Sequence, residues 1–141
     1  MPDVTRLGGL TAILLAVLAG CGQGPDAEPD GPAAAATSLT ISVVADEGAE
    51  PREMLLECDP VGGDHPNAEA ACAALADAAP AIFDPVPADQ MCTMIFGGPQ
   101  VATVTGTYDG EPVDAQFSRS NGCEIGRWDA LGTEVFDVPL Q

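Results

Sequence analysis

The chain has 141 residues, a formal net charge of −18 and no lysine. This length is typical of a single domain. The acidity argues against partners that are themselves polyanions, namely nucleic acids and anionic lipid headgroups, because the surface would repel both.

The N-terminus carries a predicted leader that does not belong to the folded domain. Arg6 is followed by an apolar run from Leu7 to Ala19, which has the length of a signal-peptide core and is too short to span a bilayer comfortably. The leader, residues 1–20, ends before Cys21 in a pattern of small residues that resembles the lipobox of bacterial lipoproteins. We therefore expect Cys21 to carry a lipid. The alternative is an ordinary secretory cleavage near Ala19, which leaves a free cysteine.

The number of cysteines supports a lipid on Cys21. The chain has five cysteines, and an odd number in an exported protein leaves one thiol without a disulfide partner. A lipid on Cys21 leaves an even set, which is Cys58, Cys72, Cys92 and Cys123. Residues 21–37 are rich in Gly, Pro, Ala and acid, so we expect a disordered tether there and a domain over residues 38–141.

The first half of the domain predicts two strands and a helix. Apolar and polar residues alternate over residues 39–43 and again over residues 53–58, where Cys58 would point inward. Residues 59–63 contain proline and two glycines and predict a turn. A helix is expected from Pro66 to Ala79, capped by Asp64 or His65 and ended by Pro80. Its apolar stripe would consist of Ala68, Cys72, Leu75 and Ala79.

The second half predicts a long connection followed by a hairpin. Residues 80–99 are irregular and carry exposed apolar residues beside Cys92, which indicates a presented segment. Residues 101–108 and 113–118 read as strands joined at Asp109-Gly110. A last strand is expected over residues 133–138. Residues 125–131 have little pattern, and Trp128 could be a core residue, a dimer contact or an exposed anchor.

These elements predict an α+β fold with a five-stranded antiparallel sheet and one main helix. A Cys58–Cys72 bridge would fasten the main helix to the second strand. A Cys92–Cys123 bridge would fasten the presented segment to the end of the sheet.

An enzyme is not expected. A Ser-His-Asp triad would have to use His65, the only histidine, whose place at a helix start is explained by capping. The four cysteines of the domain read as paired, and the motifs typical of metal, phosphate or calcium sites are absent from the sequence. We therefore expect no catalytic residues, no metal and no cofactor.

The segments around the cysteines resemble the Streptomyces subtilisin inhibitor family from Leu56 to the C-terminus. The order and spacing of the cysteines agree with the family throughout. The matching segments are Cys58-Asp59-Pro60, Gly63-Asp64-His65-Pro66, Ala70-Ala71-Cys72-Ala73-Ala74-Leu75, Met91-Cys92-Thr93-Met94, Val104-Thr105-Gly106, Asp109-Gly110, Ser120-Asn121-Gly122-Cys123-Glu124 and Val135-Phe136.

This resemblance implies a serine protease inhibitor whose reactive bond is Met94–Ile95. Thr93 and Phe96 would flank that bond, Cys92 would clamp it, and Asn121 would support the loop from behind, unless Asn121-Gly122 is a plain turn. The resemblance also implies the Cys58–Cys72 and Cys92–Cys123 disulfides, one short helix besides the main one and a homodimer formed through the sheet face. The partner would be a subtilisin-like or chymotrypsin-like protease, which binds a rigid segment with little loss of entropy.

Two features depart from the family pattern. After Phe96 the chain has Gly97-Gly98-Pro99, which predicts a looser segment on the departing side of the bond, because glycine raises backbone entropy. The lipobox predicts a protein held at the outer face of the bacterial cell membrane, although free secretion is the alternative. A non-inhibitory surface-binding or structural lipoprotein on the same scaffold is the alternative function.

Overall fold

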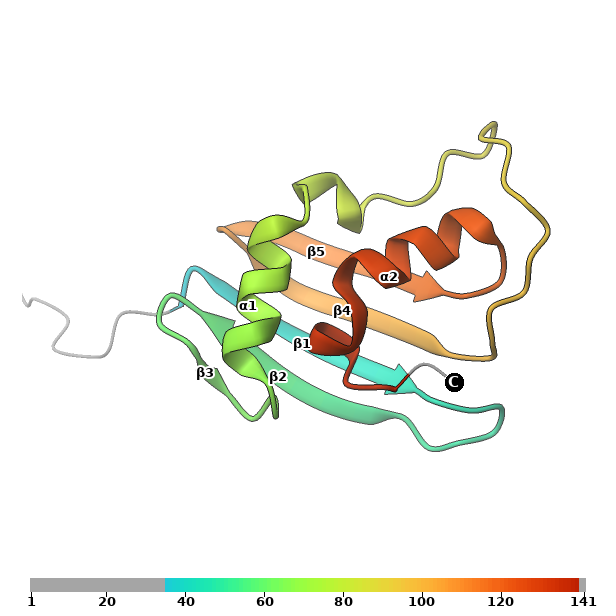
Figure 1. The fold of residues 1–141 in the computed structure, drawn as a ribbon. Coiled ribbons are helices and arrows are strands. Elements are labelled where there is room, and N and C mark those ends of the chain that lie inside the picture. Colours follow the sequence, from blue (N-terminus) through green and yellow to red (C-terminus); the bar gives the residue numbers. More distant parts are fainter. Residues whose placement is uncertain (1–34, 140–141) are drawn as a thin grey trace, which may run out of the picture. The chain divides into compact units, whose positions relative to one another are not determined.

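The computed structural model describes residues 35–139, so the predicted leader, the lipid site Cys21 and most of the tether lie outside the described part (Figure 1). Strand order in the sheet is β3-β2-β1-β4-β5, with every pair antiparallel. The elements in chain order are β1 (Thr37–Val44), β2 (Arg52–Cys58), β3 (Gly62–Gly63), α1 (Ala68–Asp77), the 3-10 helix η1 (Pro80–Phe83), β4 (Val101–Tyr108), β5 (Glu111–Ser118) and α2 (Gly122–Phe136).

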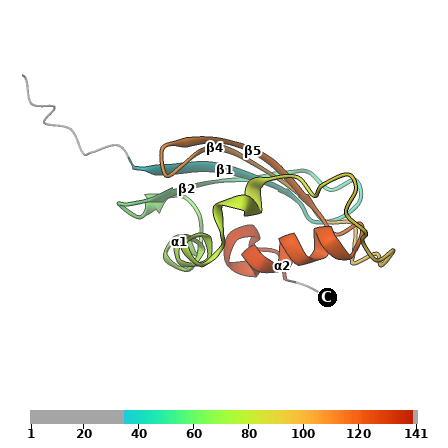
Figure 2. The same cartoon turned by 90° about the horizontal axis from the view of Figure 1, so that it is seen from above.

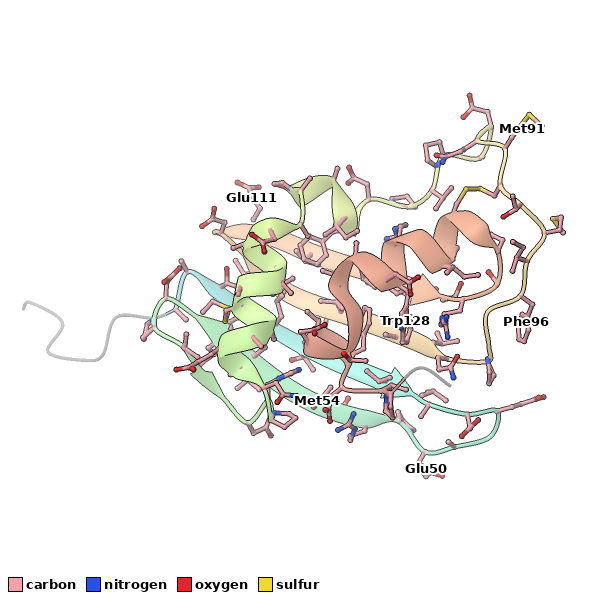
Figure 3. The ribbon with its side chains drawn as sticks, viewed as in Figure 1. Glu50, Met54, Met91, Phe96, Glu111 and Trp128 are labelled. Carbon is pink, nitrogen blue, oxygen red and sulfur yellow. A yellow bond between two sulfur atoms is a disulfide. The ribbon has the colours of Figure 1, made fainter. Side chains whose placement is uncertain are left out.

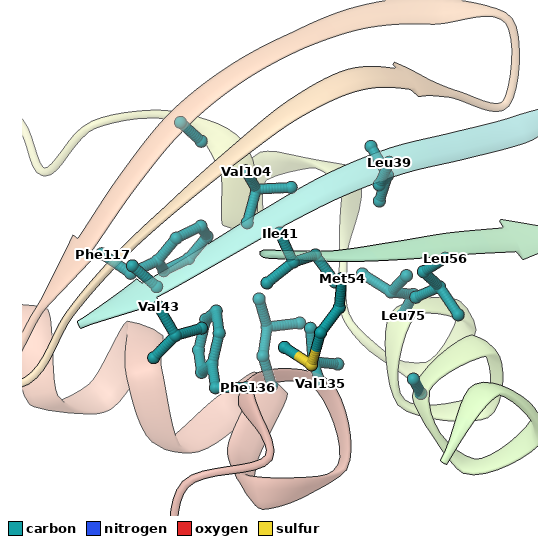
Figure 4. Close-up of a cluster of buried hydrophobic side chains, with 14 of the residues drawn as sticks. Leu39, Ile41, Val43, Met54, Leu56, Leu75, Val104, Phe117, Val135 and Phe136 are labelled. Atoms are coloured by element: carbon teal, nitrogen blue, oxygen red, sulfur yellow. The ribbon is translucent and has the colours of Figure 1, made fainter. Parts of the chain in front are cut away.

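Both α-helices cover the same face of the sheet, and the core lies between them and the strands (Figures 1 and 2). Alternation along β1 turns Leu39, Ile41 and Val43 toward the helices, and Ser38, Thr40 and Ser42 toward the other face. Phe117 of β5 and Phe136 of α2 meet with ring centroids 5.3 Å apart (Figure 4). Burying a large side chain of this kind stabilises a fold by roughly 1.5–3 kcal/mol. The core fixes the position of α2, from which the candidate site is built.

The predicted fold class is confirmed, and so is the hairpin of β4 and β5. The two strands pair from Tyr108 with Glu111 to Val101 with Ser118. Asp109 and Gly110 form the turn, and both have positive φ, as the tight turn of a two-residue hairpin requires.

The predicted start and end of the main helix were wrong. The helix α1 begins at Ala68 with Asn67 as its N-cap, and no side chain caps it. Asp64, expected as a cap, instead accepts a hydrogen bond at its Oδ1 from the N–H of Leu55 at 2.6 Å. Ala79 lies beyond the helix and is exposed, so the apolar side of α1 consists of its earlier residues, with Ala71 and Leu75 fully buried.

The strand predicted at residues 133–138 does not exist; these residues belong largely to the end of α2. The fifth strand is the short β3, where a turn was expected. Trp128 on α2 is a core residue: it is fully buried, and its ring centroid lies 4.3 Å from that of Phe136. Gly132, with φ 63° and ψ −162°, kinks α2 before its last turn.

Both predicted disulfides are present. Cys58 in β2 is bonded to Cys72 in α1, with their Cα atoms 5.8 Å apart. Cys92 in the long connection is bonded to Cys123 at the start of α2, with their Cα atoms 5.4 Å apart. These Cα separations are normal for disulfides. The first bridge joins a helix to the sheet, whereas the second ties the long connection to α2.

Candidate functional site

The most exposed apolar side chains of the described residues lie on one segment, Met91–Pro99, which we call the presented loop (Figure 3). Met94 is 95% exposed, Ile95 59% and Phe96 69%. Uncharged residues fill this segment, although the chain as a whole is strongly acidic. Contiguous apolar side chains in water typically mark a surface that a partner covers.

The part of the presented loop before the Met94–Ile95 bond, its incoming side, is fastened to the N-terminus of α2. The Cys92–Cys123 disulfide supplies the covalent link. One residue later, the carbonyl of Thr93 accepts a hydrogen bond from the N–H of Gly122 at 2.9 Å. A side chain at Gly122 would collide with Thr93, because a Cβ there would overlap the Thr93 Oγ1. The absence of a side chain at Gly122 therefore allows the close approach.

The part of the loop after the Met94–Ile95 bond, its departing side, is also held. The sequence had predicted a looser segment there because of its glycines. The N–H of Gly97 donates to the carbonyl of Arg119 at 2.7 Å, and Gly97 is half-buried against the side chain of Ile125. Gly98 has φ 138°, a conformation that other residues rarely adopt. Gly97 therefore lies close against the body of the protein, and Gly98 supplies a backbone conformation that favours glycine. We call the segment beneath the loop, Arg119–Ile125, the cradle.

Asn121 is the N-cap of α2, so it is not a plain turn residue. Its Oδ1 accepts hydrogen bonds from the N–H groups of Cys123 at 3.0 Å and Glu124 at 3.1 Å. Its carbonyl accepts from Ile125, as in the first turn of a helix. The N–H of Gly122 is another of the donors that a helix N-terminus leaves unused, and it is the one that binds Thr93. Capping therefore leaves one donor aimed at the loop.

His65 is fully engaged in the fold. Its ring is buried, its Nε2 donates to the carbonyl of Val135 at 2.8 Å, and its Nδ1 accepts from the N–H of Asn67 at 3.1 Å. These contacts tie the start of α1 to the end of α2. A ring with both nitrogens occupied in this way cannot act as a general base for a neighbouring nucleophile.

Within residues 35–139, no three His, Cys, Asp or Glu side chains gather closely enough to bind a metal ion. None of the helices in that range has the length and apolarity needed to cross a bilayer.

Sequence reasoning missed three residues of the site. Met91 is 97% exposed and lies on the same apolar run as Met94, three residues earlier, which was the available signal (Figure 3). Arg119 and Ile125 bind the departing side of the loop through a carbonyl and an aliphatic side chain. Neither contact has a signature in the sequence, because each depends on how α2 packs.

An α+β domain that holds an apolar loop extended over a helix N-terminus has the structure of a protein that offers a peptide segment to a partner. The chain matches the subtilisin inhibitor-like family model over residues 33–121. It is 40% identical over 98 residues to subtilisin inhibitor-like protein 1 of Streptomyces cacaoi. The aligned region covers 67% of this chain and 87% of that protein. The chain therefore belongs to the subtilisin inhibitor-like family, whose members are protease inhibitors and not enzymes.

One solved structure also matches part of the chain. It is the crystal structure of Streptomyces caespitosus sermetstatin in complex with Bacillus licheniformis subtilisin. The similarity covers 70% of this chain and 94% of that chain, with a TM-score of 0.44 and 23% sequence identity.

Proposed function

We propose that the domain inhibits subtilisin-like serine proteases by binding in the manner of a substrate, with Met94–Ile95 as the reactive bond. The observation that carries this proposal is the fastening of the loop on both sides of that bond. The Thr93 carbonyl is bound by Gly122, and the Gly97 N–H is bound to Arg119. Between these two points the side chain of Met94 is almost entirely in solvent.

The exposed side chains supply the binding energy. Met94 enters the primary specificity pocket of the protease, while Ile95 and Phe96 lie along the primed side and Thr93 along the other. Burying each large apolar side chain contributes roughly 1.5–3 kcal/mol. Because the disulfide at Cys92 and the two hydrogen bonds already order the loop, little conformational entropy is lost on docking.

The same fastening explains why such a loop would inhibit instead of being consumed. The catalytic serine of the protease attacks the Met94 carbonyl, forming an acyl-enzyme and releasing the Ile95 amine as the leaving group. That amine stays tethered beside the acyl group through Gly97. It can therefore attack the ester and re-form the peptide bond, releasing the serine, more readily than a freely diffusing amine could.

A titration of subtilisin with the oxidised protein tests the proposal. We expect stoichiometric inhibition, and a loss of about a hundredfold or more in affinity for Met94→Asp, because a charge would then enter an apolar pocket. Val61→Asp is the matched control, since Val61 is half-exposed near β3 and outside the presented loop. Digestion of the wild-type protein without inhibition, or equal inhibition by Met94→Asp, would contradict the proposal and favour a non-inhibitory role for the scaffold.

We also propose that Cys21 carries a lipid and holds the inhibitor at the outer face of the membrane after export. The two disulfides use four of the five cysteines, which leaves Cys21 for this modification. Any protease that the domain inhibits would then have to reach the membrane surface. Mass spectrometry of the mature N-terminus tests this placement: a diacylglycerol on Cys21 is expected, and an unmodified thiol would contradict it.

A further inference from the structure

Gly97 is a glycine for reasons of space and not of backbone conformation. Its φ lies outside the left-handed region, so other residues could adopt the same backbone. However, a Cβ at this position would lie 2.9 Å from both Cγ1 and Cδ1 of Ile125 and 3.3 Å from the Cβ of Arg119. Gly97 therefore lies where two side chains leave no room for a third.

Ile125 cannot easily move out of the way. Its backbone belongs to the first turn of α2, where its N–H donates to the carbonyl of Asn121 at 2.9 Å. Rotation about χ2 could remove Cδ1 from the contact, but Cγ1 moves only with χ1. In a helix the χ1 of isoleucine is restricted almost to one rotamer. The contact surface under Gly97 is therefore stiff.

We propose that Ile125 and Gly97 form a matched pair that positions the departing side of the reactive bond. This inference rests on the proposed function. The side chain of Ile125 determines how closely the loop can approach α2 at Gly97. Because Gly97 has no side chain, its N–H reaches the Arg119 carbonyl at 2.7 Å. Gly97 is three residues after Met94, so this hydrogen bond holds the Ile95 amine close to the acyl group after cleavage.

Two properties should change together when the pair is mismatched. The loop would be lifted from the cradle, so that it costs more entropy to dock. The Ile95 amine would also be held less closely, so that water competes better for the acyl group and the Met94–Ile95 bond is lost faster. Both effects concern the departing side only, because the Cys92–Cys123 disulfide and the Gly122–Thr93 hydrogen bond are untouched.

A double-mutant cycle tests the pair. For Gly97→Ala we expect inhibition of subtilisin to weaken about tenfold or more, as for overpacking by one methyl group, with faster cleavage of the Met94–Ile95 bond. Ile125→Ala alone should weaken inhibition less, yet added to Gly97→Ala it should improve inhibition, because it frees the space that the new Cβ needs. The matched control is Gly126→Ala, since a Cβ at Gly126 meets nothing within 4 Å; it should inhibit as the wild type does.

Amide hydrogen exchange in the free protein separates this inference from the proposed function. The Gly97 N–H should be protected in the wild type, and the amide at position 97 should lose protection in Gly97→Ala and regain it in the double variant. Equal inhibition by Gly97→Ala and the wild type would overturn the inference. It would also be overturned if Gly97→Ala weakened the inhibition of subtilisin equally in the wild-type protein and in the Ile125→Ala variant. A wild type that protects the Gly97 amide but does not inhibit subtilisin would instead overturn the proposed function.

Discussion

Arg127 on α2 connects three parts of the fold through one side chain. Its guanidinium donates to the carbonyl of Ile82 in η1 and to that of Gln116 in β5, each at 3.0 Å, and pairs with Glu124 at 2.9 Å. Its Cζ also lies 4.5 Å from the centroid of the Phe117 ring. Only a planar, forked donor can serve these acceptors together.

Replacing Arg127 should therefore lower the free energy of unfolding by more than the loss of one surface ion pair would. For Arg127→Met we expect the free energy of unfolding to fall by about 2–4 kcal/mol, because two carbonyls and a largely buried carboxylate lose their partner. Arg127→Lys should recover only part of this. Urea unfolding of the wild type and the two variants measures these differences in the free energy of unfolding. A change below about 0.5 kcal/mol in Arg127→Met is typical of an ordinary surface position and would contradict the prediction.

At the residue scale the sequence placed Cys92 and the apolar residues after it in a presented segment, because a cysteine and an apolar run are visible without a structure. The reactive bond at Met94 came from the family resemblance and stays a prediction. Sequence reasoning misjudged Gly97, since glycine normally indicates flexibility. Whether a glycine is loose or is required by a close neighbour depends on what lies opposite. Here the neighbour is Ile125, which is distant in sequence and was not assigned to any element.

At the scale of elements, α2 is the part that sequence reasoning placed wrongly. Val135 and Phe136 are strong strand formers, and Gly126 and Gly132 lower helix propensity, so residues 133–138 read as a strand. The tertiary fold overrides both preferences by burying one side of α2, where Trp128, Leu131 and Val135 recur at helical spacing. A second signal was available, because Asn121 and Glu124 have the spacing of a capping box.

The two disulfides should have separable effects. Removing Cys58–Cys72 by alanine substitution should lower the free energy of unfolding by about 3 kcal/mol and leave inhibition unchanged while the domain stays folded. Removing Cys92–Cys123, which closes a longer loop, should cost about 4 kcal/mol and also abolish inhibition. Urea unfolding and subtilisin titration at low temperature distinguish the two variants. Equal inhibition by both would show that the disulfide at Cys92 does not order the loop.

At the scale of the whole molecule, the uncovered face of the sheet bears on the homodimer that the family resemblance implied. One row of neighbouring residues crosses this face from β2 to β5 and consists of Leu55, Thr40, Thr105 and Asp114. The next row consists of Glu53, Ser42, Thr103 and Gln116. Figure 2 shows that no helix within residues 35–139 covers this side. Stable interfaces have an apolar centre. In these two rows Leu55 is the single large apolar residue, and the apolar pair of Val44 and Val101 lies at the end of its strands.

We therefore predict a monomer at micromolar concentration. The net charge of −18 adds repulsion between two copies. Sedimentation equilibrium at low and at high salt measures the mass, and screening of the charge should not produce a dimer. A dimer that survives dilution and dissociates with Leu55→Asp would show that this face is an interface after all.

The position at which subtilisin cuts the protein shows whether the Met94–Ile95 bond is held as a substrate ready for attack. The oxidised protein is incubated with a trace of subtilisin and analysed by mass spectrometry before and after reduction. We expect a single cut between Met94 and Ile95, which leaves the two fragments joined by Cys92–Cys123 and comes to a steady ratio of cut and intact protein. A first cut at any other bond, or continued digestion to short peptides, would show that the bond is not held in this way.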